Sequence, residues 1–201
     1  MPAAAKPRPR TKPPEERRSE LMSAAERLFL KHGVAATTVE QITSAAKVAK
    51  GTFYLYFSTK EDVLAGLGEQ FAQTLLTTIK NAVAAQPQDD WKGRLTAWAA
   101  AAVRGYLESI RLHDILFYSA FHPPTREGMV DNVVIDHLTD LLASGAAAGA
   151  WSIDDPRATA VFLFSGLHGV VDHAYNRERR LNRQRLTSRL QTLCLAAIAA
   201  R

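Results

Sequence analysis

The stretch AKGTFYLYFSTKEDVLAG, residues 49–66, places four aromatic rings within the five positions 53–57. Phe53 and Phe57 are four residues apart, so on a helix they share one face and can anchor it to neighbouring helices. Tyr54 and Tyr56 then point elsewhere, with their hydroxyls free. A purely internal segment would carry Leu, Ile or Val at those two positions. The stretch therefore predicts a short helix that is anchored on one side and presents tyrosines on another.

Residues 38–57 predict two short helices joined by a tight turn around Lys47 and Val48. Thr38 is a suitable N-cap for the first of them, and the second begins near Ala49 or Lys50. An earlier helix starts at Pro13–Glu16 and is stopped by Gly33. Two short helices at this spacing are typical of a helix-turn-helix, whose second helix enters the major groove of DNA.

The residue types around this second helix suit contacts with a nucleic acid. A tyrosine hydroxyl can donate to a phosphate, and its ring can pack on a sugar or a thymine methyl group. Gly51 lets a backbone come close, and Lys50 can reach a base edge or a phosphate. Lys60 lies at the start of the next helix, where its amine and free backbone N–H groups can meet one phosphate.

The longer stretch TTVEQITSAAKVAKGTFYLYFSTKEDVLAGL, residues 37–67, resembles the N-terminal DNA-binding domain of the tetracycline-repressor (TetR) family of bacterial regulators. The resemblance implies a three-helix DNA-binding domain, a linking fourth helix and a C-terminal ligand-binding domain. It also implies a homodimer that binds a palindromic DNA operator and responds to a small-molecule effector. By position, the DNA contacts it implies are Thr38, Lys50, Gly51, Thr52, Tyr54, Tyr56 and Lys60.

Two positions depart from the family pattern. Lys47 stands where the turn usually has glycine, and a left-handed backbone at a non-glycine residue costs roughly 1 kcal/mol. Ala49 stands where a serine or threonine often caps the recognition helix, and loss of that cap costs about 1 kcal/mol. Lys47 can instead supply a positive charge.

Charge is distributed unevenly along the 201 residues, whose net charge is +5. Residues 1–60 contain eleven Lys and Arg against five Glu, whereas residues 61–201 contain fourteen against fifteen Asp and Glu. This asymmetry indicates a polyanionic partner that meets one end of the molecule. We expect a disordered basic tail over 1–13, a helix-turn-helix domain over 14–60, and a ligand-binding and dimerisation domain over 61–201.

The sequence indicates a cytoplasmic protein without a disulfide. Cys194 is the one cysteine, and no run approaches the ~20 apolar residues that a membrane helix needs. Beyond residue 58 the apolar residues recur at helical spacing, with breaks at Pro87 and Pro123–Pro124. Ser58 with Glu61 predicts a capping box, and later helices are expected over 127–148, from Asp154 or Asp155, and over 184–200. The fold class is therefore all-α, with about nine helices.

The last two predicted helices are the expected dimer interface. The first of them is apolar around most of its circumference, so it must be covered on two sides. The predicted interface residues are Phe162, Leu167, Val170, Leu186, Leu190, Leu193 and Ala197. The arginines between these helices, from Arg177 to Arg189, are interpreted as a solvated connection or as charges at the dimer rim.

Five of the six histidines lie beyond residue 100, and some can share a cavity. The default expectation is a mostly apolar effector pocket, for which we name Trp98, His113, Phe117, His137, Phe164 and His168. An alternative is a metal or metal-chelate site. Imidazole and carboxylate suit Zn, Ni or Fe, and the candidates are His113, His137, His168 and Asp172.

The favoured function is a ligand-responsive transcriptional repressor that requires no cofactor. Alternatives are a constitutive, nucleoid-type DNA binder and a regulator that senses a metal ion. A metal-dependent enzyme is a remote alternative, because the sequence has no His-Glu-x-x-His, no phosphate-binding glycine loop and no nucleophile elbow. We therefore expect no catalytic residues.

Overall fold

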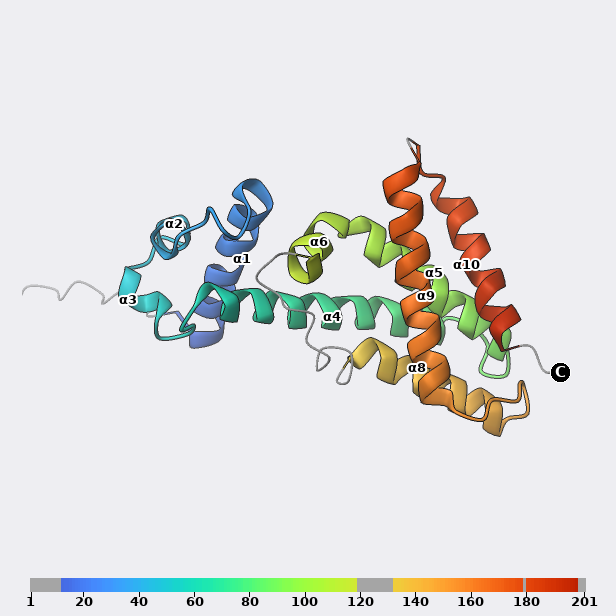
Figure 1. The fold of residues 1–201 in the computed structure, drawn as a ribbon. Coiled ribbons are helices and arrows are strands. Elements are labelled where there is room, and N and C mark those ends of the chain that lie inside the picture. Colours follow the sequence, from blue (N-terminus) through green and yellow to red (C-terminus); the bar gives the residue numbers. More distant parts are fainter. Residues whose placement is uncertain (1–11, 119–131, 179, 199–201) are drawn as a thin grey trace, which may run out of the picture. The chain divides into compact units, whose positions relative to one another are not determined.

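The computed structural model describes residues 12–118, 132–178 and 180–198, and this part of the chain is all-α, as predicted (Figure 1). Its elements are α1 (Pro14–His32), α2 (Val39–Ala45), α3 (Lys50–Phe53), α4 (Lys60–Ala84), α5 (Trp91–Glu108), α6 (Ile110–Tyr118), α8 (Val133–Ala147), α9 (Pro156–Arg177) and α10 (Arg183–Ala197). Over the same described ranges, we find no helix with the length and apolar character needed to cross a membrane.

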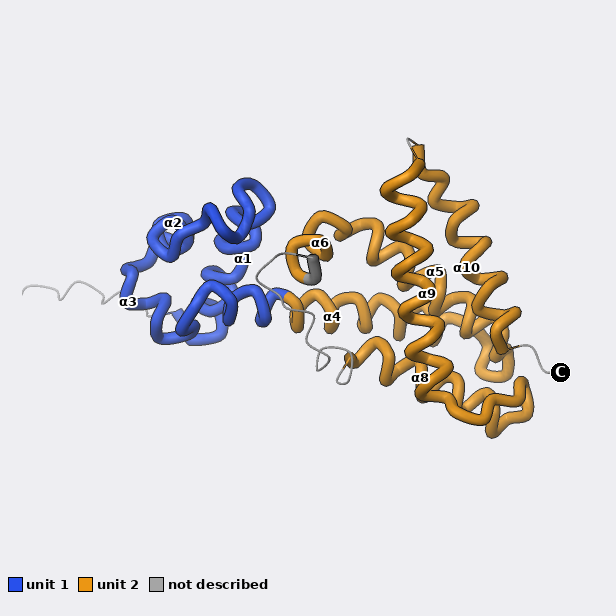
Figure 2. Tube along the Cα trace, viewed as in Figure 1, with its two compact units in different colours: residues 1–67 blue, residues 68–201 orange. Residues whose placement is uncertain are grey.

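The chain divides into two compact units, residues 1–67 and 68–201 (Figure 2). The division falls inside α4, which contributes its first turns to unit 1 and the remainder to unit 2. Most of the tail predicted over 1–13 lies outside the described residues, as does the start predicted at residue 127 for the helix that becomes α8.

Unit 1 is a small helical core with well-defined helix ends. Leu21 and Phe29 of α1, Ile42 of α2 and Phe53 of α3 are almost fully buried, and α2 contacts both α1 and α3. Gly33 ends α1 with a φ of 81°, a conformation that favours glycine. Thr38 caps α2 as predicted, because its hydroxyl accepts the N–H of Gln41 while the Gln41 side chain accepts the N–H of Thr38.

The start of α4 corrects one prediction. The capping box expected from Ser58 and Glu61 is wrong by one residue, because Thr59 and Asp62 form it instead. The Thr59 hydroxyl accepts the N–H of Asp62 at 3.1 Å, and the Asp62 carboxylate accepts the N–H groups of both Thr59 and Ser58. An aspartate at the third helical position thus closes the box here in place of the usual Glu or Gln.

Unit 2 is built around one apolar core that draws on α4, α5, α8, α9 and α10. Its largest fully buried side chains include Trp98, Tyr106, Ile135 and Leu138. Four helices begin with an Asp or Asn whose side chain accepts a backbone N–H, namely Asp90, Asn132, Asp155 and Asn182. Asp155 thus caps the helix for which Asp154 and Asp155 were the two candidates.

Cys194 lies on α10 within the core of unit 2. Burial in these apolar surroundings raises the pKa of its thiol to about 11. The thiol is therefore protonated at neutral pH and is a packing residue.

Candidate nucleic-acid interface and buried polar cluster

The turn between α2 and α3 is held by backbone hydrogen bonds and contains one left-handed residue. The N–H groups of Lys47 and Val48 donate to the carbonyls of Ser44 and Thr43, at 3.1 and 3.0 Å. Lys47 has a φ of 56°, so the conformation usually supplied by glycine is adopted here by a lysine. Ala49 occupies the N-cap of α3 and makes no side-chain capping bond there.

The aromatic stretch divides into anchors and exposed groups as its spacing predicts. Phe53 and Phe57 are buried, with ring centroids 5.7 Å apart, and the Arg18 guanidinium lies 5.2 Å from the centroid of Phe57. Tyr54 and Leu55 are 54% and 79% exposed. One detail differs from the prediction: α3 ends at Phe53, so Tyr54 is its C-cap and Tyr56 lies in the turn beyond it.

Lys50 opens α3 and is exposed, but its ammonium is paired with the Glu40 carboxylate of α2. The hydrogen bond between them raises the pKa of Lys50 and lowers the pKa of Glu40. Both side chains are largely solvated, and exposed pairs of this kind contribute little to stability. A phosphate or a base edge can therefore replace Glu40 at small cost.

Lys60 has a structural role that the sequence did not reveal. Its Nζ donates to the carbonyl oxygens of Val34 and Thr37, at 2.9 and 2.6 Å, and so ties the start of α4 to the loop before α2. This loop carries Thr38, whose position at the start of α2 is thereby fixed. The phosphate contact expected for Lys60 stays a prediction, and it has to coexist with these two bonds.

The remaining predicted contacts lie on the same short segment. Thr38 is exposed at the N-cap of α2, and Thr52 is half-buried on α3. Gly51 is exposed, and a Cβ added there would meet nothing within 4 Å. Packing within the protein therefore does not require glycine at this position, and the missing side chain leaves room for an external partner.

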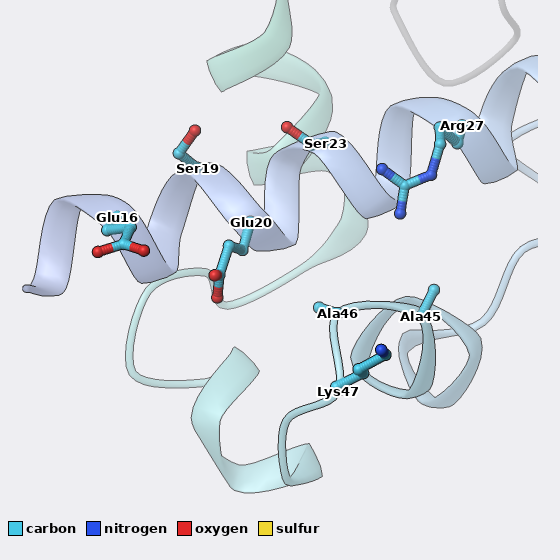
Figure 3. A pocket seen from close by; sticks show the side chains of 8 residues that line it. All are labelled: Glu16, Ser19, Glu20, Ser23, Arg27, Ala45, Ala46 and Lys47. Carbon is cyan, nitrogen blue, oxygen red and sulfur yellow. The ribbon is translucent and has the colours of Figure 1, made fainter. Parts of the chain in front are cut away.

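A surface pocket of about 420 Å³ separates α1 from the end of α2 in unit 1 (Figure 3). It is lined by Glu16, Ser19, Glu20, Ser23, Arg27, Ala45, Ala46 and Lys47. Both signs of charge occur in it, and Glu20 is already paired with Lys12 and Arg17. The lining therefore selects neither an anion nor a cation.

A cluster of polar side chains lies inside unit 2 and draws on α5, α6 and α9. We define this buried polar cluster as Tyr106, His113, His168 and Asp172. The Tyr106 hydroxyl donates to the Asp172 carboxylate, and the Tyr106 ring lies 4.1 Å from the ring centroid of His113 and 5.0 Å from that of His168. Tyr106 was not predicted, since nothing in the sequence links it to a residue 66 positions later.

Burial determines the protonation of the two histidines in this cluster. It lowers the pKa of His113 to about 3, with the neighbouring His168 adding to the effect and Asp172 opposing it. Burial also lowers the pKa of His168, whose Nδ1 lies 2.9 Å from the carbonyl oxygen of Phe164. Both imidazoles are therefore neutral at pH 7.

The other residues expected in an effector pocket are spread more widely. Trp98 is fully buried, and neither its Nε1 nor the buried Nδ1 of His137 has a hydrogen-bond partner among the described residues. His137 faces a different set of charges, since Lys80, Asp140 and Arg94 influence its pKa, which burial lowers. The ring centroids of Phe164 and His168 are 4.2 Å apart. The side chain of Phe117 lies outside the described residues.

The four candidate metal ligands do not assemble into a metal site. His113, His168 and Asp172 belong to the buried polar cluster, whereas His137 lies in the separate environment described above. Across the described ranges, no group of three or more His, Cys, Asp or Glu side chains is placed to hold a metal ion.

The predicted dimer residues separate into core and surface. Leu167, Leu186 and Leu190 are buried in the core of their own unit, which the apolar spacing alone could not distinguish from an outer face. Phe162 and Leu193 are 67% and 47% exposed, Ala197 is exposed and Val170 is half-buried. These four exposed or half-buried residues are the ones that a second subunit could reach.

Comparison with known proteins finds similar sequences among bacterial transcriptional regulators. The family model of bacterial regulatory proteins, tetR family, matches residues 21–67. The transcriptional regulator HbdR of Aromatoleum sp. (strain CIB) is 48% identical over 50 residues, which are 25% of this chain and 22% of HbdR. The chain thus spans less than a quarter of HbdR. The transcriptional regulator QacR of Staphylococcus aureus is 22% identical over 180 residues, covering 82% of this chain and 88% of QacR.

A solved structure extends the similarity in fold to both units. The fatty acid degradation regulator FadR of Bacillus halodurans is 23% identical and superposes with a TM-score of 0.74. The superposition covers 96% of this chain and 100% of that chain. At this identity the likeness concerns the fold, an N-terminal helix-turn-helix followed by a helical domain.

Proposed function

The chain belongs to the tetR family of bacterial regulatory proteins, and from this premise we propose that it is a ligand-responsive repressor. Members of this family are DNA-binding transcription factors and not enzymes. In this proposal a homodimer binds a palindromic operator through α3. A small molecule bound in unit 2 then favours a conformation with lower operator affinity.

The observation that carries the proposal is the arrangement of residues 50–57. Two buried phenylalanines fix the segment, while Tyr54 and Leu55 between them remain exposed. Adjacent exposed apolar side chains, held rigidly beside a lysine, are a feature of interaction surfaces. DNA suits this segment, since phosphates can accept hydrogen bonds from Lys50, Thr38 and the tyrosine hydroxyls.

The exposed apolar residues of α9 and α10 support the homodimer. Phe162 and Leu193 would leave water if a second copy packed against these helices. A two-fold axis through this face presents two recognition segments to a palindromic site.

Unpartnered buried groups support an effector site in unit 2. The Nε1 of Trp98 is a donor without an acceptor among the described residues, and such groups are rare in folded proteins. An effector with a carbonyl or ether oxygen would satisfy it. The neutral histidines of the buried polar cluster favour an uncharged ligand beside them.

Operator binding is tested by selecting fragments of genomic DNA with the purified protein and measuring affinity for the enriched palindrome. We expect Tyr54→Ala to weaken this binding by about tenfold or more, since a hydrogen bond to a charged phosphate contributes ~1.5–3 kcal/mol. The matched control is Tyr175→Ala, a tyrosine on α9 that is 44% exposed, against 54% for Tyr54. Failure to enrich any sequence, or equal losses in both variants, would reject the proposed recognition surface.

The effector is sought by adding compounds to the protein–operator complex and following both release of DNA and tryptophan fluorescence. All three tryptophans, Trp91, Trp98 and Trp151, lie in unit 2, so their emission reports on this unit. A true effector changes both signals, and Trp98→Phe weakens its binding. A compound that releases DNA without changing the fluorescence acts elsewhere and would count against this site.

A further inference from the structure

A pocket of about 780 Å³ lies between the end of α9 and the start of α10. The two helices lie side by side and are joined at this end (Figure 1). The charged or titratable residues that line it are His173, Arg177, Glu178, Arg180, Arg185 and Arg189. We call this the α9–α10 pocket. None of its lining residues belongs to the buried polar cluster or to residues 50–57, so neither of these explains its composition.

Positive charge is concentrated here against the trend of the surrounding sequence. Residues 173–189 contain six arginines and one glutamate, whereas the remainder of 61–201 contains eight Lys and Arg against fourteen Asp and Glu. Within the described residues, none of the four pocket arginines takes part in an ion pair. Four unneutralised guanidinium groups around one hollow repel one another, and a bound anion relieves this repulsion.

The start of α10 adds to the positive potential. Asn182 caps this helix and lines the pocket, and the first turn contains no acidic residue. Arg183 and Arg185 lie there instead, at the end of the helix dipole where cations are unfavourable and anions are favoured. The usual preference for Asp or Glu in a first turn is reversed at this pocket. Departures of this kind tend to occur at binding sites.

We propose that the α9–α10 pocket binds a small molecule that carries phosphoryl groups. Guanidinium groups match phosphoryl oxygens in geometry and can donate two hydrogen bonds to each group. The volume exceeds that of a single oxyanion and falls in the range of sites for small organic ligands. Ala174 and Leu186 give the pocket an apolar wall on which an organic body can pack.

Glu178 further limits the kind of ligand that can fit the α9–α10 pocket. It is the one carboxylate in the lining, and it disfavours a ligand that is anionic over its whole surface. A phosphate ester with a hydroxyl or amino group away from the phosphate fits both the arginines and Glu178. Free inorganic oxyanions share the phosphate chemistry but leave the apolar wall uncovered.

The test uses calorimetric titration of the full chain at constant ionic strength, with inorganic pyrophosphate and ADP as probes. The pocket variant is Arg185→Gln/Arg189→Gln. The control variant is Lys92→Gln/Arg104→Gln, which removes the same charge from exposed positions of α5 outside the pocket lining. Circular dichroism checks that both variants are folded.

We expect saturable binding to the wild type, a loss of about tenfold or more in the pocket variant, and a change of less than about twofold in the control. Tighter binding of ADP than of pyrophosphate assigns the site to phosphate esters, and equal binding assigns it to free oxyanions. Absence of saturable binding, or equal weakening in both variants, overturns the proposal. The proposal is also overturned if the pocket variant weakens binding of duplex DNA but not of pyrophosphate or ADP. None of these readouts depends on operator recognition.

Discussion

Aromatic side chains are used differently in the two units. In unit 1, Phe53, Tyr54 and Phe57 lie within five residues, and their exposure alternates between buried anchors and an exposed ring. In unit 2, the rings of Tyr106, His113 and His168 come from three helices and pack on one another around a carboxylate. A contiguous segment presents groups to an external partner, whereas a cluster assembled from distant segments is enclosed by the fold.

This difference has consequences for how each unit responds to change. The recognition segment depends on a few buried anchors, so that exposed positions beside them can vary without loss of the fold. The buried polar cluster depends on burial itself, because the same desolvation that encloses the histidines keeps them neutral. Substitutions should therefore act locally in unit 1, and pH should act mainly on unit 2.

The largest effect is expected at Phe53. Phe53→Ala removes a fully buried ring and should destabilise unit 1 by about 3–5 kcal/mol, with loss of DNA binding. Urea unfolding followed by circular dichroism measures the loss of stability, and titration with operator DNA measures the loss of binding. We expect the tryptophan fluorescence of unit 2 to stay unchanged. Leu55→Ala is the matched control, since Leu55 is 79% exposed and should change stability by less than about 0.5 kcal/mol. Similar losses in both variants would contradict the division into anchors and exposed groups.

The next effect concerns pH and unit 2. The folded-state pKa of His113 is about 3, below its unfolded value, so the unfolded chain binds more protons and stability falls as pH decreases below about 6.5. Between pH 6.5 and 4.5 this histidine alone should cost about 2 kcal/mol. Urea unfolding followed by tryptophan fluorescence measures the slope.

His113→Phe keeps a ring beside Tyr106 and should reduce this pH dependence. Leu116→Ala, a buried neighbour on α6, should lower stability by a similar amount at every pH and serves as the control. An unchanged slope in His113→Phe would show that other groups cause the loss at low pH.

Substitution of Lys60 tests whether its ammonium group stabilises the fold of unit 1, in contrast to Lys50, whose ammonium group is proposed to bind DNA. Lys60→Met removes two hydrogen bonds from a charged donor and should destabilise unit 1 by about 1.5–3 kcal/mol. Lys50→Met removes an exposed pair with Glu40 and should leave the unfolding transition unchanged while weakening operator binding. The two measurements are urea unfolding and the salt dependence of DNA affinity. If Lys60→Met changes only the salt dependence, the ammonium serves DNA and not the loop.

The smallest effect is expected at Lys47, and its sign is opposite. Lys47→Gly relieves the left-handed backbone and should stabilise unit 1 by up to about 1 kcal/mol. Lys31→Gly, in the last turn of α1, should destabilise by about 1 kcal/mol because glycine is unfavourable within a helix. Thermal unfolding distinguishes the two changes. A loss of stability in Lys47→Gly would mean that the lysine side chain makes a contact worth more than the strain.

The sequence predicted unit 1 well, because its signals are local. The N-cap at Thr38 and the anchors Phe53 and Phe57 each follow from spacings of four residues or fewer. The left-handed backbone at Lys47 was suggested instead by the glycine that the resembled family usually has there. The capping box at α4 was misplaced by one residue, because serine and threonine adjoin there and both satisfy the pattern.

Unit 2 was predictable only as a set of helices. The bond between Tyr106 and Asp172 joins positions 66 residues apart, and no spacing rule connects them. Leu167, Leu186 and Leu190 follow the same apolar period whether they face the core or a partner. His137 is the same residue type as His113 and His168, but it lies near other charged side chains. These distinctions depend on how the helices pack together.

The buried thiol of Cys194 can report on transient opening of unit 2 around α10. The chain has one cysteine, and its thiol is both enclosed and protonated at neutral pH, so a thiol reagent reacts only when unit 2 transiently opens around α10. The labelling rate therefore measures the frequency of this opening without any engineered probe. A molecule that binds unit 2 in its closed form should slow the reaction in proportion to its occupancy, so the native chain supplies an assay for ligands whose chemistry is unknown.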